Sequence, residues 1–212
     1  MYKLFWSPGS ASMTPHAVLE EIGAPFELIK IDLDAGQHRK PEYLKLNPNA
    51  RVPTLVYDGD EVIYEAAAIS LFLLERHPET GLAPAPGDAK RARFLQWMVY
   101  LTNTLQECLI HYWHPDNFLP DAARQADLKQ AAEVRAGRLF AFLDGELAAH
   151  GPFLCGERLY LCDYYLAMIA RWTRLMAKPA HTLPNINTLI RAALARPGYT
   201  RMLAAEGIDQ PV

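Results

Sequence analysis

Cysteine is scarce in this sequence of 212 residues, which contains only Cys108, Cys155 and Cys162. No two of them form a CxxC pair, and an odd number suits reduced thiols in a core better than a disulfide framework. Long apolar runs are also missing, because the longest candidate, residues 159–170, contains an aspartate and falls short of the roughly twenty residues of a membrane span. The N-terminal segment breaks at Ser7-Pro8-Gly9 before a signal-peptide core could form, so we expect a cytoplasmic protein.

No charge sign dominates either, since 21 basic residues stand against 24 acidic ones for a formal net charge of −3. Such a chain has no overall attraction to phosphate groups, which argues against nucleic acid and anionic membranes as partners. Half of the residues are hydrophobic, as a folded protein with a sizeable core requires. The length suits one large domain or two modest ones.

The N-terminal part of the chain alternates short extended runs with helical ones. The polar segment 34–46 predicts a loop with one helical turn, and Asp58-Gly59-Asp60 is typical of a hairpin turn between two β-prone runs. The resulting order is βαβ, loop, ββα, which is a compact α/β unit. We expect strands at 2–6, 26–31, 54–57 and 61–64, a helix ending before Gly23, and a second helix at 65–76.

A proline- and glycine-rich stretch then separates this part from a helical one. We expect an α/β domain at residues 1–78, a linker at 79–87 and an all-helical domain at 88–212, without internal repeats. The helices of the second domain are expected at 89–114, 121–150, 163–176, 183–195 and 197–205.

Two short segments carry the most specific pattern. They are Asn47-Pro48-Asn49-Ala50-Arg51-Val52-Pro53-Thr54-Leu55 and, after the hairpin, Glu65-Ala66-Ala67-Ala68-Ile69. Together they resemble the glutathione transferase superfamily, whose order of elements also matches along the whole chain. The resemblance implies a thioredoxin-like α/β N-terminal domain followed by an all-α C-terminal domain, with glutathione as co-substrate.

The chemistry of these segments suits an extended peptide with free carboxylates. Val52 precedes a proline and is therefore pushed into an extended conformation, whose open edge can pair with a bound peptide. The resemblance implies a cis Val52–Pro53 bond and pairing of Val52 with the cysteinyl backbone of glutathione. It also implies that the Ala66 N–H at a helix start binds the γ-glutamyl carboxylate while Glu65 accepts the ammonium group. Arg51 is a further candidate contact to a carboxylate.

The sequence departs from the family at two of these positions. Ala50 stands where glycine is usual, which brings the local turn into question, and Ala66 stands where serine is frequent. The missing hydroxyl removes a hydrogen bond to a charged group that is worth about 1.5–3 kcal/mol.

The turn after the first strand is where family members place the residue that activates the glutathione thiol. In the bacterial beta-type proteins this residue is a cysteine, and its position holds Ala11 here, which excludes mixed-disulfide chemistry. Ser10 and Ser12 remain as candidates to donate a hydrogen bond to the thiolate. Ser12 lies four residues before His16, a spacing that theta-type members share and that favours Ser12. Ser10 is nearer the Gly9 turn, which favours Ser10. The alternative for Ser12 is a role as helix N-cap.

Polar and aromatic residues of the first long helix are candidates for binding the second substrate. The spacing of Glu107, His111 and His114 is compatible with metal ligation. A helix end that faces a cleft explains these residues better, so we predict no metal site. The candidates for substrate contact are Tyr100, Thr104, Gln106, His111 and Trp113.

We therefore predict a glutathione transferase that conjugates the glutathione thiolate to a small hydrophobic electrophile in detoxification. The alternatives are a glutathione-dependent isomerase or disulfide reductase, and a non-catalytic interaction module of the same fold. The resemblance implies a homodimer, and Asp163, within a family-like stretch at 153–163, is expected to serve a buried network at a helix start.

Overall fold

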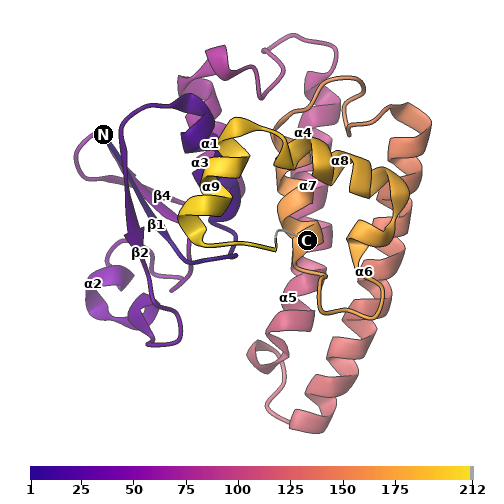
Figure 1. Ribbon diagram of the computed structural model, residues 1–212. Coiled ribbons are helices and arrows are strands. Elements are labelled where there is room, and N and C mark those ends of the chain that lie inside the picture. Colours follow the sequence, from indigo (N-terminus) through magenta and orange to yellow (C-terminus); the bar gives the residue numbers. More distant parts are fainter. Residues whose placement is uncertain (211–212) are drawn as a thin grey trace. The chain divides into compact units, whose positions relative to one another are not determined.

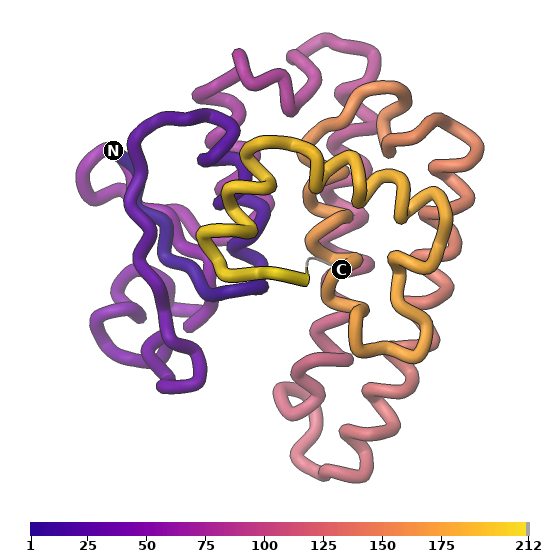
Figure 2. Tube along the Cα trace, in the orientation of Figure 1, coloured from indigo at the N-terminus to yellow at the C-terminus, as the bar shows by residue number. Residues whose placement is uncertain are grey.

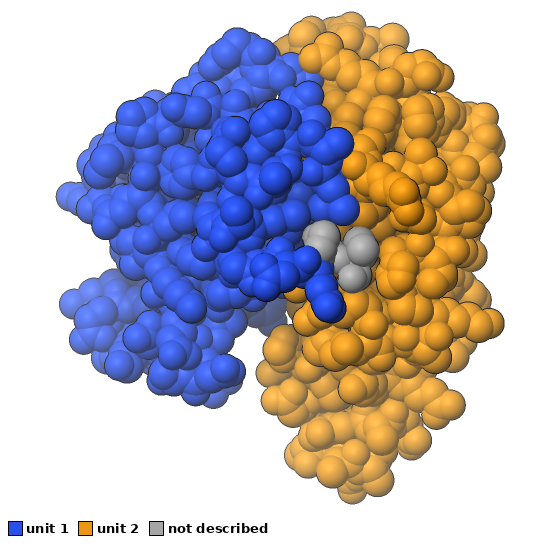
Figure 3. Space-filling model, in the orientation of Figure 1, with its two compact units in different colours: residues 1–83, 194–211 blue, residues 84–193, 212 orange. Residues whose placement is uncertain are grey.

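The computed structural model describes residues 1–210 of the chain, which divide into two compact units (Figure 3). The first unit contains residues 1–83 and, in addition, the stretch that begins at Leu194 and includes the last helix; the second contains residues 84–193. The expected division gave residues 194–212 to the helical domain. The difference arises because the last helix finds its packing partner in the first unit.

The first unit is a four-stranded sheet covered by helices (Figure 1). The strand order is β2-β1-β3-β4, with β1 and β2 parallel and the other pairs antiparallel. The elements are β1 (Tyr2–Trp6), α1 (Met13–Ile22), β2 (Phe26–Lys30), α2 (Pro41–Leu44), β3 (Thr54–Tyr57), β4 (Glu61–Tyr64), α3 (Ala66–Arg76) and α9 (Pro197–Glu206). These elements confirm the expected βαβ, loop, ββα order, including the Asp58-Gly59-Asp60 hairpin.

Helix α1 is buried on almost every side. Met13 to Leu19 are all buried, which a helix on the surface of a sheet would not achieve, because such a helix leaves one face to water. The outer side is covered by α9, which lies alongside α1 (Figures 1 and 2). Gly198 allows this close approach, since a Cβ at this position would lie 2.8 Å from the backbone nitrogen of Glu21.

The second unit is all helical. Its elements are α4 (Arg91–Tyr100), a π-helical segment (Leu101–Gln106), α5 (Glu107–Trp113), α6 (Ala122–His150), α7 (Leu161–Arg171) and α8 (Pro184–Leu194). Helix α7 forms its core, because Leu161 to Ala170 are all buried. Among the described residues, no helix has both the length and the apolar character needed to cross a membrane.

The start of α7 depends on the carboxyl group of Asp163. Its Oδ2 accepts the Tyr160 N–H at 2.8 Å, and its Oδ1 accepts the Leu154 N–H at 2.9 Å. Asp163 is fully buried, and this burial raises its pKa from the ordinary 3.8 to about 7 despite the two backbone donors. The carboxyl group therefore ties the loop before α7 to the first turn of the helix.

This pKa makes stability depend on pH in a defined direction. The folded protein keeps a proton on Asp163 that the unfolded chain releases above about pH 4, so the free energy of unfolding falls between about pH 4 and 7, by up to ~1.4 kcal/mol per pH unit. Asp163→Asn removes this titration. We expect the stability difference between wild type and variant, measured by urea unfolding, to shrink with rising pH; two parallel curves would contradict the assignment.

Candidate functional site

Three segments of the first unit meet at one end of the sheet. Phe5 pairs with Thr54, and Thr54 pairs with Tyr64, so these residues form one row across β1, β3 and β4. The turn after β1, the Val52–Pro53 segment before β3 and the Glu65–Ala66 segment after β4 all leave the sheet next to this row. The topology thus brings together the three stretches that the sequence singled out.

The turn after β1 buries one of its two candidate serines. The Ser12 side chain is inaccessible to solvent, and its hydroxyl donates to the Ser7 carbonyl oxygen at 3.1 Å. Ser10 is partly exposed, and its Oγ lies 2.7 Å from that of Ser12. Because Ser12 uses its single hydroxyl hydrogen on Ser7, the hydrogen between the two serines comes from Ser10.

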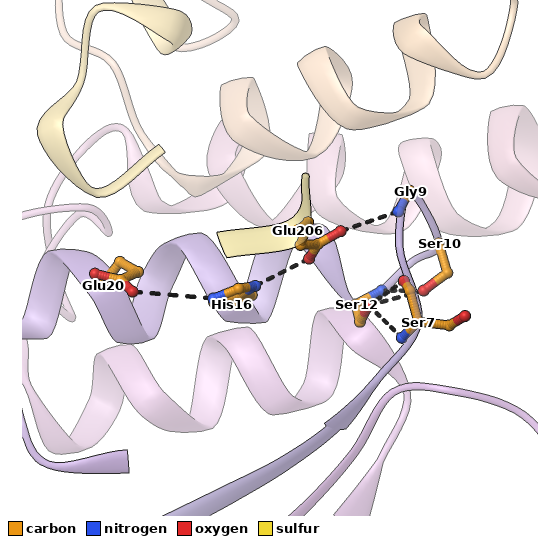
Figure 4. Close-up of polar contacts among 7 residues, drawn as sticks. All are labelled: Ser7, Gly9, Ser10, Ser12, His16, Glu20 and Glu206. Atoms are coloured by element: carbon orange, nitrogen blue, oxygen red, sulfur yellow. Dashed lines mark hydrogen bonds and ion pairs between the residues drawn. The ribbon is translucent and has the colours of Figure 1, made fainter. Parts of the chain in front are cut away.

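A buried carboxylate of the last helix, α9, binds the backbone of this turn. Glu206 Oε2 accepts the Gly9 N–H at 2.9 Å, and Glu206 Oε1 lies 2.9 Å from His16 Nδ1 (Figure 4). A carboxylate only accepts hydrogen bonds, so His16 carries its hydrogen on Nδ1. His16 Nε2 faces Glu20 Oε1 at 3.9 Å, too far for a hydrogen bond.

This contact was missed by sequence reasoning. Glu206 lies near the end of the chain, one residue beyond the helix expected at 197–205, and no local signal links it to Gly9 or His16. The side chains of Glu206 and His16 are both fully buried in the first unit, which marks them as parts of the support of the turn.

The Val52–Pro53 bond is cis, as the resemblance implied. Within residues 1–210, neither the N–H nor the carbonyl group of Val52 makes a hydrogen bond. Val52 therefore presents the open backbone edge that the sequence analysis expected, available to an extended peptide.

Three polar side chains fix this segment in place, and sequence reasoning did not find them as a group. The Tyr43 hydroxyl and the Asn47 side-chain amide both donate to the Arg51 carbonyl oxygen, at 2.6 and 2.8 Å. Both also contact Thr54 Oγ1, at 2.9 and 3.2 Å. Burial raises the pKa of Tyr43, so its phenol stays protonated and keeps its donor role. The preceding turn forms although Ala50 replaces glycine, with Ala50 in the left-handed region at φ 53°.

Glu65 leaves β4 in an unusual conformation. Its φ is 75°, a region that residues with a Cβ avoid at a cost of order 1–3 kcal/mol, and such residues cluster at functional sites. The Glu65 side chain is exposed, and Ala66 begins α3, where the first backbone N–H groups have no partner within the helix. An exposed carboxylate thus lies beside unpaired helix N–H groups, and the exposed Arg51 precedes the open edge on the neighbouring segment.

The five residues of the second unit that were expected to contact the second substrate lie in different environments. The Tyr100 ring packs on Phe142 of α6, and Gln106 Oε1 accepts a hydrogen bond of 2.6 Å from Tyr165 of α7. Within the same unit, Thr104 lies half-buried in the π-helical segment, His111 stacks on Phe118, and the Trp113 indole donates to the Trp172 carbonyl oxygen at 3.1 Å. Among the described residues, no group of three or more side chains is arranged to hold a metal ion.

Comparison with known proteins decides the family. The family model of the glutathione S-transferase N-terminal domain matches residues 1–75, and that of the C-terminal domain matches residues 103–197. The GST-like protein YncG of Escherichia coli is 33% identical over 81% of this chain and 82% of its own length. This chain belongs to the glutathione S-transferase family.

Solved glutathione S-transferases share its fold along nearly the full length. A sphingomonad glutathione S-transferase, solved as a complex with glutathione, is 31% identical, with a TM-score of 0.84 and coverage of 97% of this chain and 99% of the other. A glutathione transferase from Methylococcus capsulatus is 30% identical, with a TM-score of 0.86 and coverage of 98% and 100%. The resemblance drawn from residues 47–55 and 65–69 is thus confirmed, as is the two-part fold that it implied.

In this glutathione S-transferase, the buried Glu206 carboxylate can be tested by an isosteric change. Glu206→Gln keeps the shape of the side chain but replaces one acceptor oxygen by an NH2 group, so either the Gly9 N–H or the His16 ring N–H loses its partner. We expect a loss of about 1–3 kcal/mol in the free energy of unfolding, measured by urea denaturation. The matched change Glu75→Gln, on the exposed side of α3, should stay within about 0.5 kcal/mol of wild type. Equal stabilities of the two variants would show that the Glu206 contacts contribute nothing.

Proposed function

We propose that this protein binds glutathione and transfers its thiolate to a small hydrophobic electrophile. The observation that carries the proposal is the unpaired backbone of Val52, which lies at the same sheet end as the exposed Glu65 carboxylate and the partly exposed Ser10. A peptide with its own carboxylate and ammonium groups complements this set of groups. Further support comes from the sphingomonad transferase, which was crystallised with glutathione and is 31% identical to this chain.

Each group has a distinct role in the proposal. The backbone of Val52, oriented by Pro53, pairs with the cysteinyl backbone of glutathione. The Ala66 N–H binds the γ-glutamyl carboxylate at the positive end of α3, and Glu65 accepts the γ-glutamyl ammonium group. Arg51 contacts a further carboxylate of the tripeptide.

We assign thiol activation to Ser10 and a supporting role to Ser12. Ser12 is buried and gives its hydrogen to Ser7, so it has none to offer a ligand. The Ser10 hydroxyl donates to Ser12, a neutral acceptor, and a thiolate is a stronger acceptor because it is charged. When the thiolate binds, the Ser10 hydrogen turns to the sulfur, which stabilises the anion and lowers the thiol pKa.

The second substrate is an apolar molecule with an electrophilic carbon, which the bound thiolate attacks to form a carbon–sulfur bond. We propose that side chains of the second unit contact this molecule, with Tyr100, Thr104, Gln106, His111 and Trp113 as the candidates. Because these five residues lie in different environments, one small molecule contacts only some of them. Holding the two reactants together and stabilising the thiolate then supply most of the rate enhancement. This chemistry fits a detoxifying role in the cytoplasm, a compartment in which free cysteines such as the three of this chain are common.

The two serines separate the catalytic proposal from its alternatives. For Ser10→Ala we expect a fall of roughly 100-fold in the rate of thiol transfer to a chromogenic aryl halide, as for loss of one donor to a developing anion. For Ser12→Ala we expect a rate within a few-fold of wild type and a loss of about 1–3 kcal/mol in stability, because Ser7 loses its buried partner.

The control is the ultraviolet absorbance of bound thiolate as a function of pH, which should report a raised thiol pKa in Ser10→Ala alone. Full activity in Ser10→Ala would refute the assignment of the activating group. A wild-type protein that binds glutathione but transfers it to no electrophile would favour the interaction module, and activity only on disulfides or isomerisable substrates would favour the reductase or isomerase.

We also propose that the protein is a homodimer. Leu95 and Val99, one turn apart on α4, are 40% and 57% exposed, so two large apolar side chains lie next to each other on the surface. Large apolar side chains grouped on a surface favour a protein partner. We expect light scattering at micromolar concentration to give twice the mass of one chain, and Val99→Glu to reduce it to one chain mass. A single-chain mass for the wild type would contradict the proposal.

A further inference from the structure

Two of the three cysteines lie side by side in the second unit. The Sγ atoms of Cys155 and Cys162 are 3.8 Å apart, close enough for a thiol–thiol hydrogen bond. Both side chains are buried, with 3% of Cys155 and none of Cys162 exposed to solvent. The third cysteine, Cys108, lies elsewhere in the unit, where its thiol donates to the Ala132 carbonyl oxygen.

The backbone around the pair is held on both sides. Cys155 lies in a tight turn closed by reciprocal hydrogen bonds of 3.1 and 3.0 Å between Phe153 and Gly156. Cys162 lies in the first turn of α7. Asp163 joins the two segments, since one carboxyl oxygen binds the Leu154 N–H and the other binds the Tyr160 N–H. The two sulfur atoms therefore face each other because the same carboxyl group fixes both segments.

The surroundings make the two thiols unequal. The hydrogen bond from Cys162 lowers the pKa of the Cys155 thiol, and the positive charges of Arg93 and Lys90 act in the same direction against burial. Arg93 is anchored nearby, with its Nε donating to the Leu154 carbonyl oxygen at 2.8 Å. Burial raises the pKa of Cys162, which therefore keeps its hydrogen for Cys155. Cys155 is the better nucleophile, and Cys162 is the thiol placed to react with it.

We propose that Cys155 and Cys162 form a dithiol site that small hydroperoxides oxidise to an intramolecular disulfide. The Cys155 thiolate attacks one oxygen of hydrogen peroxide, the O–O bond breaks, and the departing hydroxide takes up a proton and leaves as water. The Cys162 sulfur then attacks the resulting Cys155 sulfenic acid, the S–S bond forms, and the S–O bond breaks. The hydroxide released combines with the Cys162 proton, so two thiols are oxidised and one peroxide is reduced to two waters.

The geometry suits the second step in particular. The sulfur atoms need to approach from 3.8 Å to about 2.0 Å, the length of a disulfide bond. Asp163 Oδ2 lies 3.9 Å from the Cys162 sulfur, which places a hydrogen-bond acceptor beside the attacking thiol. An excess of a small dithiol reverses the reaction by thiol–disulfide exchange.

Tryptic peptide mapping tests the proposal on the full-length protein. Arg158 lies between the two cysteines, so trypsin separates Cys155 and Cys162 into the peptides 139–158 and 159–171. After reduction, removal of the reductant and treatment with hydrogen peroxide, we expect these peptides to appear joined and to separate on addition of dithiothreitol. Cys108, in peptide 94–124, should remain available to iodoacetamide after unfolding and serves as the internal control.

Variants distinguish this pairing from unspecific oxidation. Cys108→Ser should still give the joined peptides. The number of its thiols that iodoacetamide alkylates after unfolding should fall from two to none on oxidation. Cys155→Ser should lose the joined peptides and leave Cys162 alkylatable. The proposal is overturned if the oxidised wild type, which needs no substitution to be tested, keeps both thiols free, or if Cys155 is converted to sulfinic acid without joining Cys162.

Discussion

The buried carboxylate of Glu206 is the contact on which the first unit's candidate site depends. It accepts the Gly9 N–H and faces His16 Nδ1, so a residue of the last helix holds the first turn of the chain. The His16 ring is fully buried, so its donor needs an acceptor, because an unpaired polar group inside a protein costs more than a hydrogen bond gains. This contact is one of several that hold α9 on α1, together with the hydrogen bond from the Gly198 N–H to Glu21 and the Arg201–Glu20 ion pair.

The site itself is a consequence of strand register. The row of Phe5, Thr54 and Tyr64 sets three loops at one end of the sheet, and each loop contributes a different kind of group. One offers a hydroxyl, one an open backbone edge and one a carboxylate beside helix N–H groups. Glu65 has a positive φ there, and Ala50 has one in the turn before Val52. Residues with a Cβ prefer a negative φ, so at both positions the surrounding packing outweighs this local preference.

Local patterns predicted most of the fold because they depend on neighbouring residues. The Asp58-Gly59-Asp60 turn fixed the hairpin, and Gly23 ends α1 in the left-handed conformation expected of a C-cap. The placement of α9 was not predictable in this way, since Glu206 and Gly9 are linked only through tertiary packing. The choice between Ser10 and Ser12 also needed coordinates: both precede the helix, and only burial and hydrogen-bond counting distinguish them. The group of Tyr43, Asn47 and Thr54 was not predicted. Its members meet around the Arg51 carbonyl oxygen, and a backbone oxygen is the same in every residue type, so the sequence does not show which one is bound.

The most direct test of the account is a calorimetric titration with reduced glutathione near neutral pH, on the wild type and on Glu65→Gln. The account predicts saturable binding with one site per chain in the wild type, and at least tenfold weaker binding in the variant, since an exposed carboxylate that pairs with an ammonium group is lost. No binding by the folded wild type at millimolar glutathione would contradict it, and would leave the Val52 edge without the ligand proposed for it.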